Sequence, residues 1–194
     1  MRPRGKLLPL HGADDRAELS DDALIAACAT GDDAARSRLF ERHVDAVHRF
    51  VGRMQASDDG EVDDLVQATF VEAFRSAARY RGPSVRAWLY GIAANLTRAY
   101  ARREIRRKRA HQAIASVDRL PATLDMVRRD VLARLPAALT ALPHDLRTVF
   151  ILVDLEQQRG CEVAAALRIP EGTVWRRLYR ARQALRITLE GGRP

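Results

Sequence analysis

Apolar side chains recur every three or four residues through most of this 194-residue chain, and nowhere do they alternate with polar ones over a useful length. The first spacing gathers apolar groups on one face of an α-helix, whereas strict alternation is typical of a half-buried strand. We therefore predict an all-α fold. The helices expected from this spacing cover residues 20–31, 33–54, 63–79, 85–109, 126–141, 144–156, 160–167 and 171–189.

The predicted helices fall into two small modules. Residues 20–109 hold four helices, which is enough to close one core. Residues 110–125 lose the apolar period and contain Pro121, which predicts a flexible linker that leaves the spacing of the modules undetermined. Residues 126–190 form the second module. Residues 1–19, rich in Pro, Gly and charge, are expected to be a disordered leader.

The composition of the chain indicates which kind of binding partner and which cellular compartment to expect. Lys and Arg number 33 against 25 Asp and Glu, a net charge of +8, which favours a polyanionic partner. Cys28 and Cys161 are too few and too isolated for a disulfide framework or a zinc site, so we expect a reducing cytoplasm, with Cys28 buried on a helix face. No apolar run is long enough to span a membrane, so no membrane insertion is expected.

The last predicted helix has two contrasting faces and follows the short turn 169–172, an order typical of a helix-turn-helix. Its inward stripe is apolar and consists of Val174, Leu178, Ala181 and Leu185. Its outward face carries basic and aromatic residues, namely Trp175, Arg176, Tyr179, Arg180 and Arg182. Arginines suit phosphates and guanine edges, and no acid interrupts residues 173–186, so this helix is predicted to enter a DNA major groove.

Signals for catalysis are weak. We predict that the chain is not an enzyme and that it has no catalytic residue, metal or cofactor. His43 and His48 are five residues apart, which does not place two imidazoles on one helical face. No phosphate-binding glycine loop and no nucleophile setting is recognisable. The acidic residues at 58–64 leave a metal-dependent hydrolase as a remote alternative.

Several segments, in this order and at this spacing, resemble the extracytoplasmic-function (ECF) sigma factors, small members of the sigma-70 family of bacterial initiation factors. The resemblance covers about 20–109 and 126–188. The first part contains Asp63–Phe70, similar to the polymerase-binding helix, and Tyr80-Arg81-Gly82 with Trp88–Asn95, similar to the −10 segment. The second contains Ala141-Leu142-Pro143 and Ile169–Val174, followed by Arg177, Arg180-Ala181-Arg182 and Leu185, similar to the −35 helix-turn-helix. Gln157 and Arg168 stand where the family usually has glycine.

The resemblance implies a protein that binds core RNA polymerase, at the clamp helices of the large subunit and at the flap, and directs promoter-specific initiation. It also implies promoter DNA and an anti-sigma factor as partners. Polymerase would be contacted by Asp64, Leu65 and Gln67 as exposed or half-exposed groups. The −10 element would be contacted by Tyr80, Arg81, Asn95, Arg98 and Arg102. The −35 element would be contacted by Thr173, Trp175, Arg176, Arg177, Tyr179 and Arg180.

Plainer interpretations remain open for several of these residues. The acids at 58–64 also suit a solvated helix start, and the basic run 102–109 also suits a solvated face. Trp88 lies on the apolar stripe and fits the core, Trp175 fits either DNA or the core, and Arg177 fits a brace within the module. A conventional helix-turn-helix regulator is the alternative function, although it would leave the first module unexplained.

Overall fold

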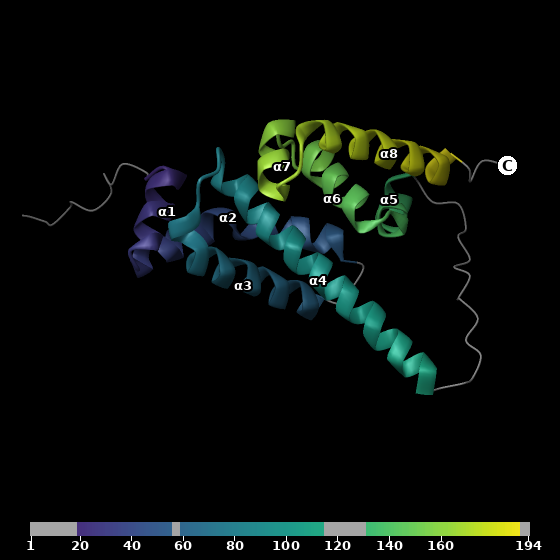
Figure 1. Ribbon diagram of the computed structural model, residues 1–194, viewed down its shortest axis with the longest axis horizontal. Coiled ribbons are helices and arrows are strands. Elements are labelled where there is room, and N and C mark those ends of the chain that lie inside the picture. Colours follow the sequence, from purple (N-terminus) through teal and green to yellow (C-terminus); the bar gives the residue numbers. More distant parts are fainter. Residues whose placement is uncertain (1–18, 56–58, 115–130, 191–194) are drawn as a thin grey trace, which may run out of the picture.

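A computed structural model describes residues 19–55, 59–114 and 131–190, and these residues are helical without a strand (Figure 1). The first helix group comprises α1 (Asp21–Ala29), α2 (Asp33–Met54), α3 (Asp59–Ser76), the 3₁₀ turn η1 (Ala77–Arg79) and α4 (Val85–Ile114). The second group comprises α5 (Val131–Ala141), α6 (His144–Phe150), the π-helical η2 (Ile151–Leu155), α7 (Gly160–Leu167) and α8 (Glu171–Glu190). The all-α prediction is confirmed.

Helices α1 and α2 begin where a polar side chain caps the first turn. The Ser20 hydroxyl accepts a hydrogen bond from the Ala23 amide at 3.2 Å, and the Asp32 carboxylate accepts one from the Ala35 amide at 3.0 Å. Each cap satisfies a backbone donor that has no partner in the first turn. Gly31, with φ of +92°, turns the chain between α1 and α2 in a conformation that favours glycine.

Some predicted boundaries were wrong by a few residues. Helix α3 begins at Asp59 instead of 63, and its predicted end is a separate 3₁₀ turn. Helix α4 continues to Ile114, five residues past the expected end at 109, because this stretch is rich in good helix formers. The predicted leader up to residue 18, the rest of the linker and residues 126–130 lie outside the described residues.

The first group encloses an apolar core. Leu24, Leu39 and Phe50 are fully buried on α1 and α2, and they pack with Leu89 and Tyr90 of α4. The rings of Phe50 and Tyr90 lie 5.2 Å apart between centroids. The predicted burial of Cys28 is confirmed, since it is 1% exposed.

The second group closes around the inward stripe of α8. All four residues of that stripe are buried: Val174, Leu178, Ala181 and Leu185. Leu139, Leu142 and Leu146, from α5, the following turn and α6, cover its C-terminal half. The predicted division of α8 into an apolar and a polar face is therefore confirmed.

The two groups also pack against each other, an arrangement that the sequence had left undetermined. Helix α4 lies along α7 in Figure 1, and Val149, Leu152 and Val163 of the second group join the core of the first. The backbones approach closely where a Cβ added at Gly91 of α4 would lie 2.4 Å from the Ala166 carbonyl oxygen. This contact places predicted −10 residues beside the second group.

Candidate polymerase and nucleic-acid interfaces

The turns before α7 and before α8 keep helix-turn-helix geometry without the usual glycines. Gln157 and Arg168 have φ of 54° and 53°, so both occupy the left-handed region that glycine favours. The side-chain amide of Gln157 donates to the Asp154 carbonyl at 2.8 Å. The backbone N–H of Arg168 donates to carbonyls at the end of α7. Both residues therefore adopt the left-handed conformation that glycine favours, and the chain bends at these two positions without a glycine.

The outward face of α8 is exposed as predicted. Trp175 and Tyr179 are 48% and 65% exposed, and Arg176 and Arg180 lie in solvent beside them. Arg176 donates to the Thr173 hydroxyl at 3.2 Å. This face combines cationic, aromatic and hydroxyl groups, which suits phosphate and base contacts.

Trp175, for which the sequence had left DNA contact or the core open, is 48% exposed and packs on one side only. Its indole N–H donates to Glu171 at 3.2 Å, and its ring covers Gly160, where an added Cβ would lie 2.5 Å from Trp175 Cζ2. One side of the ring thus fixes α8 to the start of α7, and the other side faces solvent.

Arg177 acts as a brace. It is half-buried and donates to Asp145 Oδ2 at 3.0 Å, which ties α8 to the first turn of α6. The structure therefore places Arg177 apart from the exposed basic face that carries Arg176 and Arg180.

The predicted −10 residues lie in two places. Tyr80 and Arg81 belong to the turn before α4, where Arg81 donates to the carbonyls of Ala78 and Tyr80. The ring of Tyr80 packs against Trp88 with 5.3 Å between centroids, and burial raises the pKa of Tyr80 to about 12. Trp88 is half-buried against the core, as the packing interpretation expected.

Asn95, Arg98 and Arg102 lie at positions i, i+3 and i+7, on one face of α4. All three are exposed, and Arg98 also forms an ion pair with Asp145 of α6 at 3.1 Å. A cleft of about 80 Å³ separates these helices, and Asn95, Arg98 and Arg177 all line it. The structure thus brings one predicted −10 residue and one predicted −35 residue to the same carboxylate.

His144 lies at the edge of this cleft. Its Nε2 is 3.1 Å from the hydroxyl of Thr97 in α4. Burial lowers the pKa of His144 to about 4, and nearby arginines add to the effect although Asp145 opposes it. The imidazole is therefore neutral at physiological pH and contributes no charge to the basic surface.

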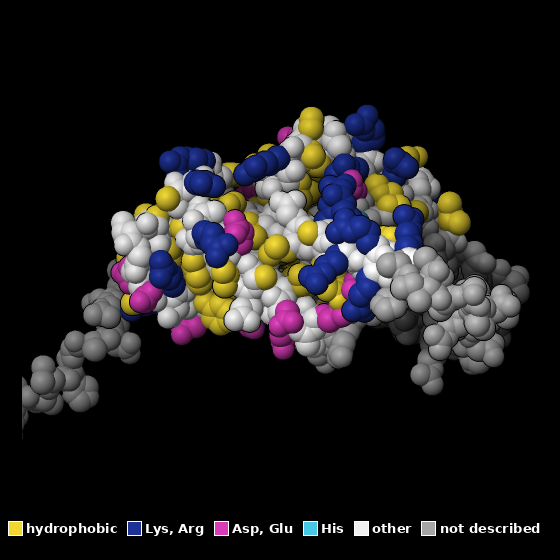
Figure 2. Space-filling model, turned by 60° about the horizontal axis from the view of Figure 1, so that its bottom comes forward, with side chains coloured by type: hydrophobic (Ala, Val, Ile, Leu, Met, Phe, Trp, Pro, Cys, Tyr) yellow, Lys and Arg dark blue, Asp and Glu magenta, His cyan; other side chains and the backbone are white. Residues whose placement is uncertain are grey.

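The C-terminal half of α4 extends beyond the helix bundle in Figure 1 and carries most of the predicted basic run. Its exposed arginines include Arg102, Arg103, Arg106 and Arg107, and among these Arg107 pairs with Glu104 at 3.2 Å. Figure 2 shows the densest run of Arg and Lys side chains on the right of the face that it presents, with others spread over the left. Such an exposed group suits phosphate contacts.

Helix α3 presents a different surface. Asp64 and Gln67 are exposed, but Leu65 is only 8% exposed, so the prediction that Leu65 is an exposed contact was wrong. Leu65 belongs to the apolar stripe that packs into the core. The exposed apolar groups are instead Val71, 48% exposed, and Phe40 of α2, 40% exposed.

Val71 and Phe40 were missed by the sequence analysis, although one signal could have found Val71. It follows Gln67 by four residues and Asp64 by seven, so all three share a helical face. Phe40 packs edge-to-face on Phe70 with 4.8 Å between centroids, which holds its exposed edge in place.

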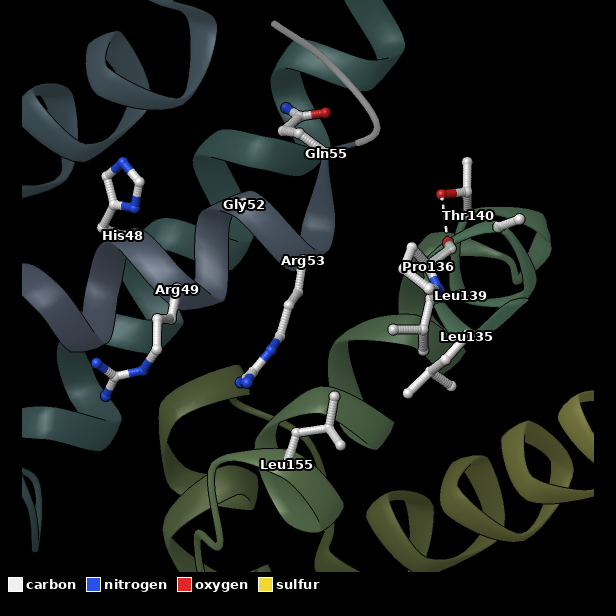
Figure 3. A pocket seen from close by; sticks show the side chains of 11 residues that line it. His48, Arg49, Gly52, Arg53, Gln55, Leu135, Pro136, Leu139, Thr140 and Leu155 are labelled. Carbon is white, nitrogen blue, oxygen red and sulfur yellow. Dashed lines mark hydrogen bonds between the residues drawn. The ribbon is translucent and has the colours of Figure 1, made fainter. Parts of the chain in front are cut away.

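A cavity of about 850 Å³ separates α2 from α5 (Figure 3). One wall is polar and basic and includes His48, Arg49 and Arg53. The other wall is mainly apolar and consists of Leu135, Pro136, Ala137, Leu139, Thr140 and Leu155. The two helix groups are therefore incompletely packed on this side.

Neither a metal cluster nor a membrane span is found in the part of the chain that the structure describes. No three His, Cys, Asp or Glu side chains there are grouped to hold a metal ion. His43 instead lies 2.9 Å from Asp21, and His48 lies 3.3 Å from Asp63. None of the described helices is both long and apolar enough to cross a membrane.

Two helix groups, one ending in a helix-turn-helix and the other in an arginine-rich helix, define a two-module α-helical protein of the DNA-binding type. The family models agree with this division: the model of sigma-70 region 2 matches residues 39–108, and that of sigma-70 region 4 matches residues 132–185. The chain belongs to the sigma-70 family and is an ECF sigma factor, as the relatives below establish.

The ECF RNA polymerase sigma factor SigM of Mycobacterium tuberculosis is 31% identical over 91% of this chain and 88% of its own length. The ECF sigma factor SigE of Mycolicibacterium smegmatis is 35% identical over 81% of this chain, but the match spans only 64% of that longer relative. The ECF sigma-E factor of Escherichia coli K12 is 30% identical over 87% of this chain and 93% of its own length.

Two solved structures are similar over most of the chain. CnrH, solved in complex with the cytosolic domain of CnrY, has a TM-score of 0.65 and 27% identity over 89% of this chain and 99% of CnrH. The sigma factor RpoE of Bartonella quintana, solved in complex with the anti-sigma factor NepR, has a TM-score of 0.63 and 25% identity over 81% of this chain and 98% of RpoE.

Proposed function

We propose that this chain binds core RNA polymerase and directs initiation at promoters by recognising their −35 and −10 elements. The observation that carries the proposal is the outward face of α8, where Trp175, Arg176, Tyr179 and Arg180 are exposed together. The polymerase performs the chemistry, and no catalytic role is assigned to this chain. A conventional regulator is less favoured because it would not need the exposed surfaces of α3 and α4.

The two modules divide the work. The first, predicted as residues 20–109, corresponds to sigma region 2 and would bind polymerase and the −10 element. The second, predicted as 126–190, corresponds to sigma region 4 and would bind the −35 element and the polymerase flap. The function implies a cytoplasmic compartment, with the protein on the nucleoid when it is part of the holoenzyme.

At the −35 element, we assign duplex contacts to Arg176 and Arg180, with Thr173 near the helix start available for a phosphate. Trp175 and Tyr179 would supply flat apolar contact, for example with thymine methyl groups. The ion pair between Arg177 and Asp145 supports an orienting role for Arg177, which would fix the angle of α8 on the DNA.

At the −10 element, we assign contacts with melted DNA to Asn95, Arg98 and Arg102, with Tyr80 and Arg81 farther along the strand. Unstacked bases can be held by aromatic and amide groups, and the arginines suit the backbone phosphates. Because separating a base from its stack costs a few kcal/mol, several such contacts are needed to favour the open state.

For polymerase docking, we assign Asp64 and Gln67 as polar contacts and Val71 with Phe40 as the apolar anchor. This anchor replaces Leu65, whose side chain is 8% exposed and committed to the core. Exposed apolar side chains on α2 and α3, together with charged groups, suit an interface in which charge steers and apolar contact holds.

An anti-sigma factor is proposed as a further partner. The support is that the similar structure of RpoE was solved with the anti-sigma factor NepR. The identity of such a partner does not follow from the residues of this chain.

Charge reversal tests the two interfaces separately. Arg176→Glu with Arg180→Glu should weaken binding to −35 DNA and spare polymerase binding, whereas Asp64→Arg with Gln67→Arg should weaken polymerase binding and spare DNA. Arg49→Glu and Asp45→Arg, single charge reversals at exposed positions on α2, are the controls for reversing a charge elsewhere on the surface. Undiminished DNA affinity in the first variant, or undiminished polymerase binding in the second, would reject the corresponding assignment.

A further inference from the structure

The cavity between α2 and α5 has the size and the lining of a ligand site. Its volume of about 850 Å³ lies within the range of about 300 to 1,000 Å³ that such sites occupy. Ligand sites are mostly apolar and carry a few polar groups that fix orientation, and this cavity has one apolar and one basic wall. Its lining residues Gly52, Pro136 and Thr140 are exposed, so a ligand can enter without unfolding either helix.

Polar contacts fix the separation of the two walls. Arg53 of α2 pairs with the buried carboxylate of Glu156, which follows η2 directly. The Arg147 guanidinium of α6 donates to the Met54 carbonyl at the end of α2 at 2.7 Å, and to the Leu142 carbonyl after α5 at 3.0 Å. The cavity therefore lies between anchored elements, and a ligand does not have to order them first.

Gly52 leaves the α2 wall open. A glycine inside a helix is less favourable than an alanine, because it has more backbone freedom to lose on folding. Nothing lies within 4 Å of a Cβ added at Gly52, so no clash requires glycine at this position. Because Gly52 lines the cavity, the missing side chain gives a ligand space beside the helix backbone (Figure 3).

The α2 wall also offers donors to an anion. Arg49 and Arg53 are four residues apart, so they lie on the same side of α2. Arg49 is exposed and has no ion-pair partner among the described residues, whereas Arg53 and Arg86 share Glu156. The Gln55 Nε2 atom is buried without a hydrogen-bond partner in the same part of the chain, which is unfavourable unless an acceptor approaches. This wall therefore suits a carboxylate.

The opposite wall suits an apolar chain. Figure 3 shows the side chains of Leu135 and Leu139 directed from α5 toward the space between α5 and α2. Pro136, Ala137 and Leu155 extend this apolar lining. An alkyl chain placed along these groups would remove apolar surface of both partners from water.

We propose that this cavity binds a single-chain amphiphile with a carboxylate head, the chemistry of a medium-chain fatty acid. The head would lie at Arg49 and Arg53, with the Gln55 amide as a further donor, and the chain would lie along the leucines of α5. None of the residues that line the cavity is assigned to polymerase or DNA. The site therefore goes beyond the proposed function and can be tested without polymerase or a promoter.

Isothermal titration calorimetry on the full-length chain tests the site with octanoate as the probe. Octanol, which has the same chain without the charge, should bind at least about tenfold more weakly, because it loses charge-assisted hydrogen bonds. Octanoate should bind about 15-fold more tightly than hexanoate, since each buried CH₂ contributes about fourfold in affinity. Acetate, which is the head alone, should give no detectable binding.

Two variants test the two walls. Gly52→Leu fills the space beside α2 and should weaken octanoate binding at least about tenfold, because displacing two buried CH₂ groups already costs about 15-fold. Its matched control is Gly60→Leu on α3, where an added Cβ also has nothing within 4 Å and which does not line the cavity. Arg49→Gln should weaken octanoate binding about threefold to fivefold, as the loss of an exposed charge contact does. Arg75→Gln, an exposed position on α3, should leave binding unchanged.

Urea unfolding provides a second readout that separates a filled cavity from a misfolded variant. Octanoate should raise the midpoint of wild type and Gly60→Leu but not that of Gly52→Leu, whose own midpoint should be no lower than that of wild type because leucine favours the helix. Equal binding of octanol and octanoate would show that the basic wall selects nothing. Equal binding by wild type and Gly52→Leu would place the ligand elsewhere, and absence of octanoate binding would leave the cavity without this ligand; each of the three results overturns the proposal.

Discussion

Replacing Glu156 by Gln should destabilise the folded chain by about 2 kcal/mol. The carboxylate accepts three hydrogen bonds, from Arg53, Arg86 and the Tyr90 hydroxyl. Bonds to charged groups contribute about 1.5 to 3 kcal/mol each when shielded from water. The side chains of Arg53 and Arg86 are 36% and 41% exposed, so they regain water and the total is discounted strongly.

Equilibrium urea unfolding followed by circular dichroism measures this loss. With a urea dependence of about 2 kcal/mol per molar, the midpoint should fall by about 1 M. Glu72→Gln is the control, because Glu72 is 48% exposed and pairs only loosely with Arg75 at 3.8 Å. Equal midpoints for the two variants would refute the reasoning that the second group is anchored through Glu156.

Three further predictions concern pH, packing and salt. Burial lowers the pKa of His144 to about 4, below the unfolded value of 6.5, so the unfolded chain binds a proton at a higher pH than the folded chain does. The contribution of neutral His144 to the free energy of unfolding is therefore complete above pH 6.5 and is lost as the pH falls toward 4. The loss should be about 3 kcal/mol by pH 4. His144→Gln should flatten that part of the pH profile of unfolding free energy, leaving the smaller effect of His43, whose pKa burial also lowers. Phe50→Ala should cost about 3 to 5 kcal/mol in thermal or urea unfolding, since Phe50 is fully buried; a cost near that of an exposed substitution would contradict the described core. Arg176→Ala with Arg180→Ala should reduce the slope of log affinity for duplex DNA against log salt by about 2 if each arginine contacts one phosphate, and an unchanged slope would exclude those contacts.

Local patterns predicted the helices well because each helix buries a stripe set by its own residues. The stripe of α8 and the burial of Cys28 on its helix face are local properties, and both are confirmed. Helix ends were less predictable: nothing in the apolar spacing distinguishes the π-helical turn after Phe150 from a continued α-helix.

Exposure was harder to predict where one helix has a wide apolar stripe. Leu65 and Val71 both lie near the edge of the stripe on α3, and the packing of neighbouring helices decides that Leu65 is buried and Val71 exposed. A helical wheel carries no information about those neighbours.

Contacts between the helix groups could not be read from the sequence at all. Glu156 is one acid among 25 Asp and Glu residues, and its partners lie 66 to 103 positions away. Gly91 looks like an ordinary helical glycine until the backbone of α7 is placed beside it. Such long-range pairings depend on how finished helices pack, which local periodicity does not encode.

The most direct test of the proposed function is co-purification of the full-length protein with bacterial core RNA polymerase, followed by run-off transcription from a genomic promoter library. We predict a stable complex and new start sites that require this protein, with both lost in the Asp64→Arg, Gln67→Arg variant. Binding to duplex DNA without polymerase binding or new start sites would contradict the proposal and favour a conventional regulator.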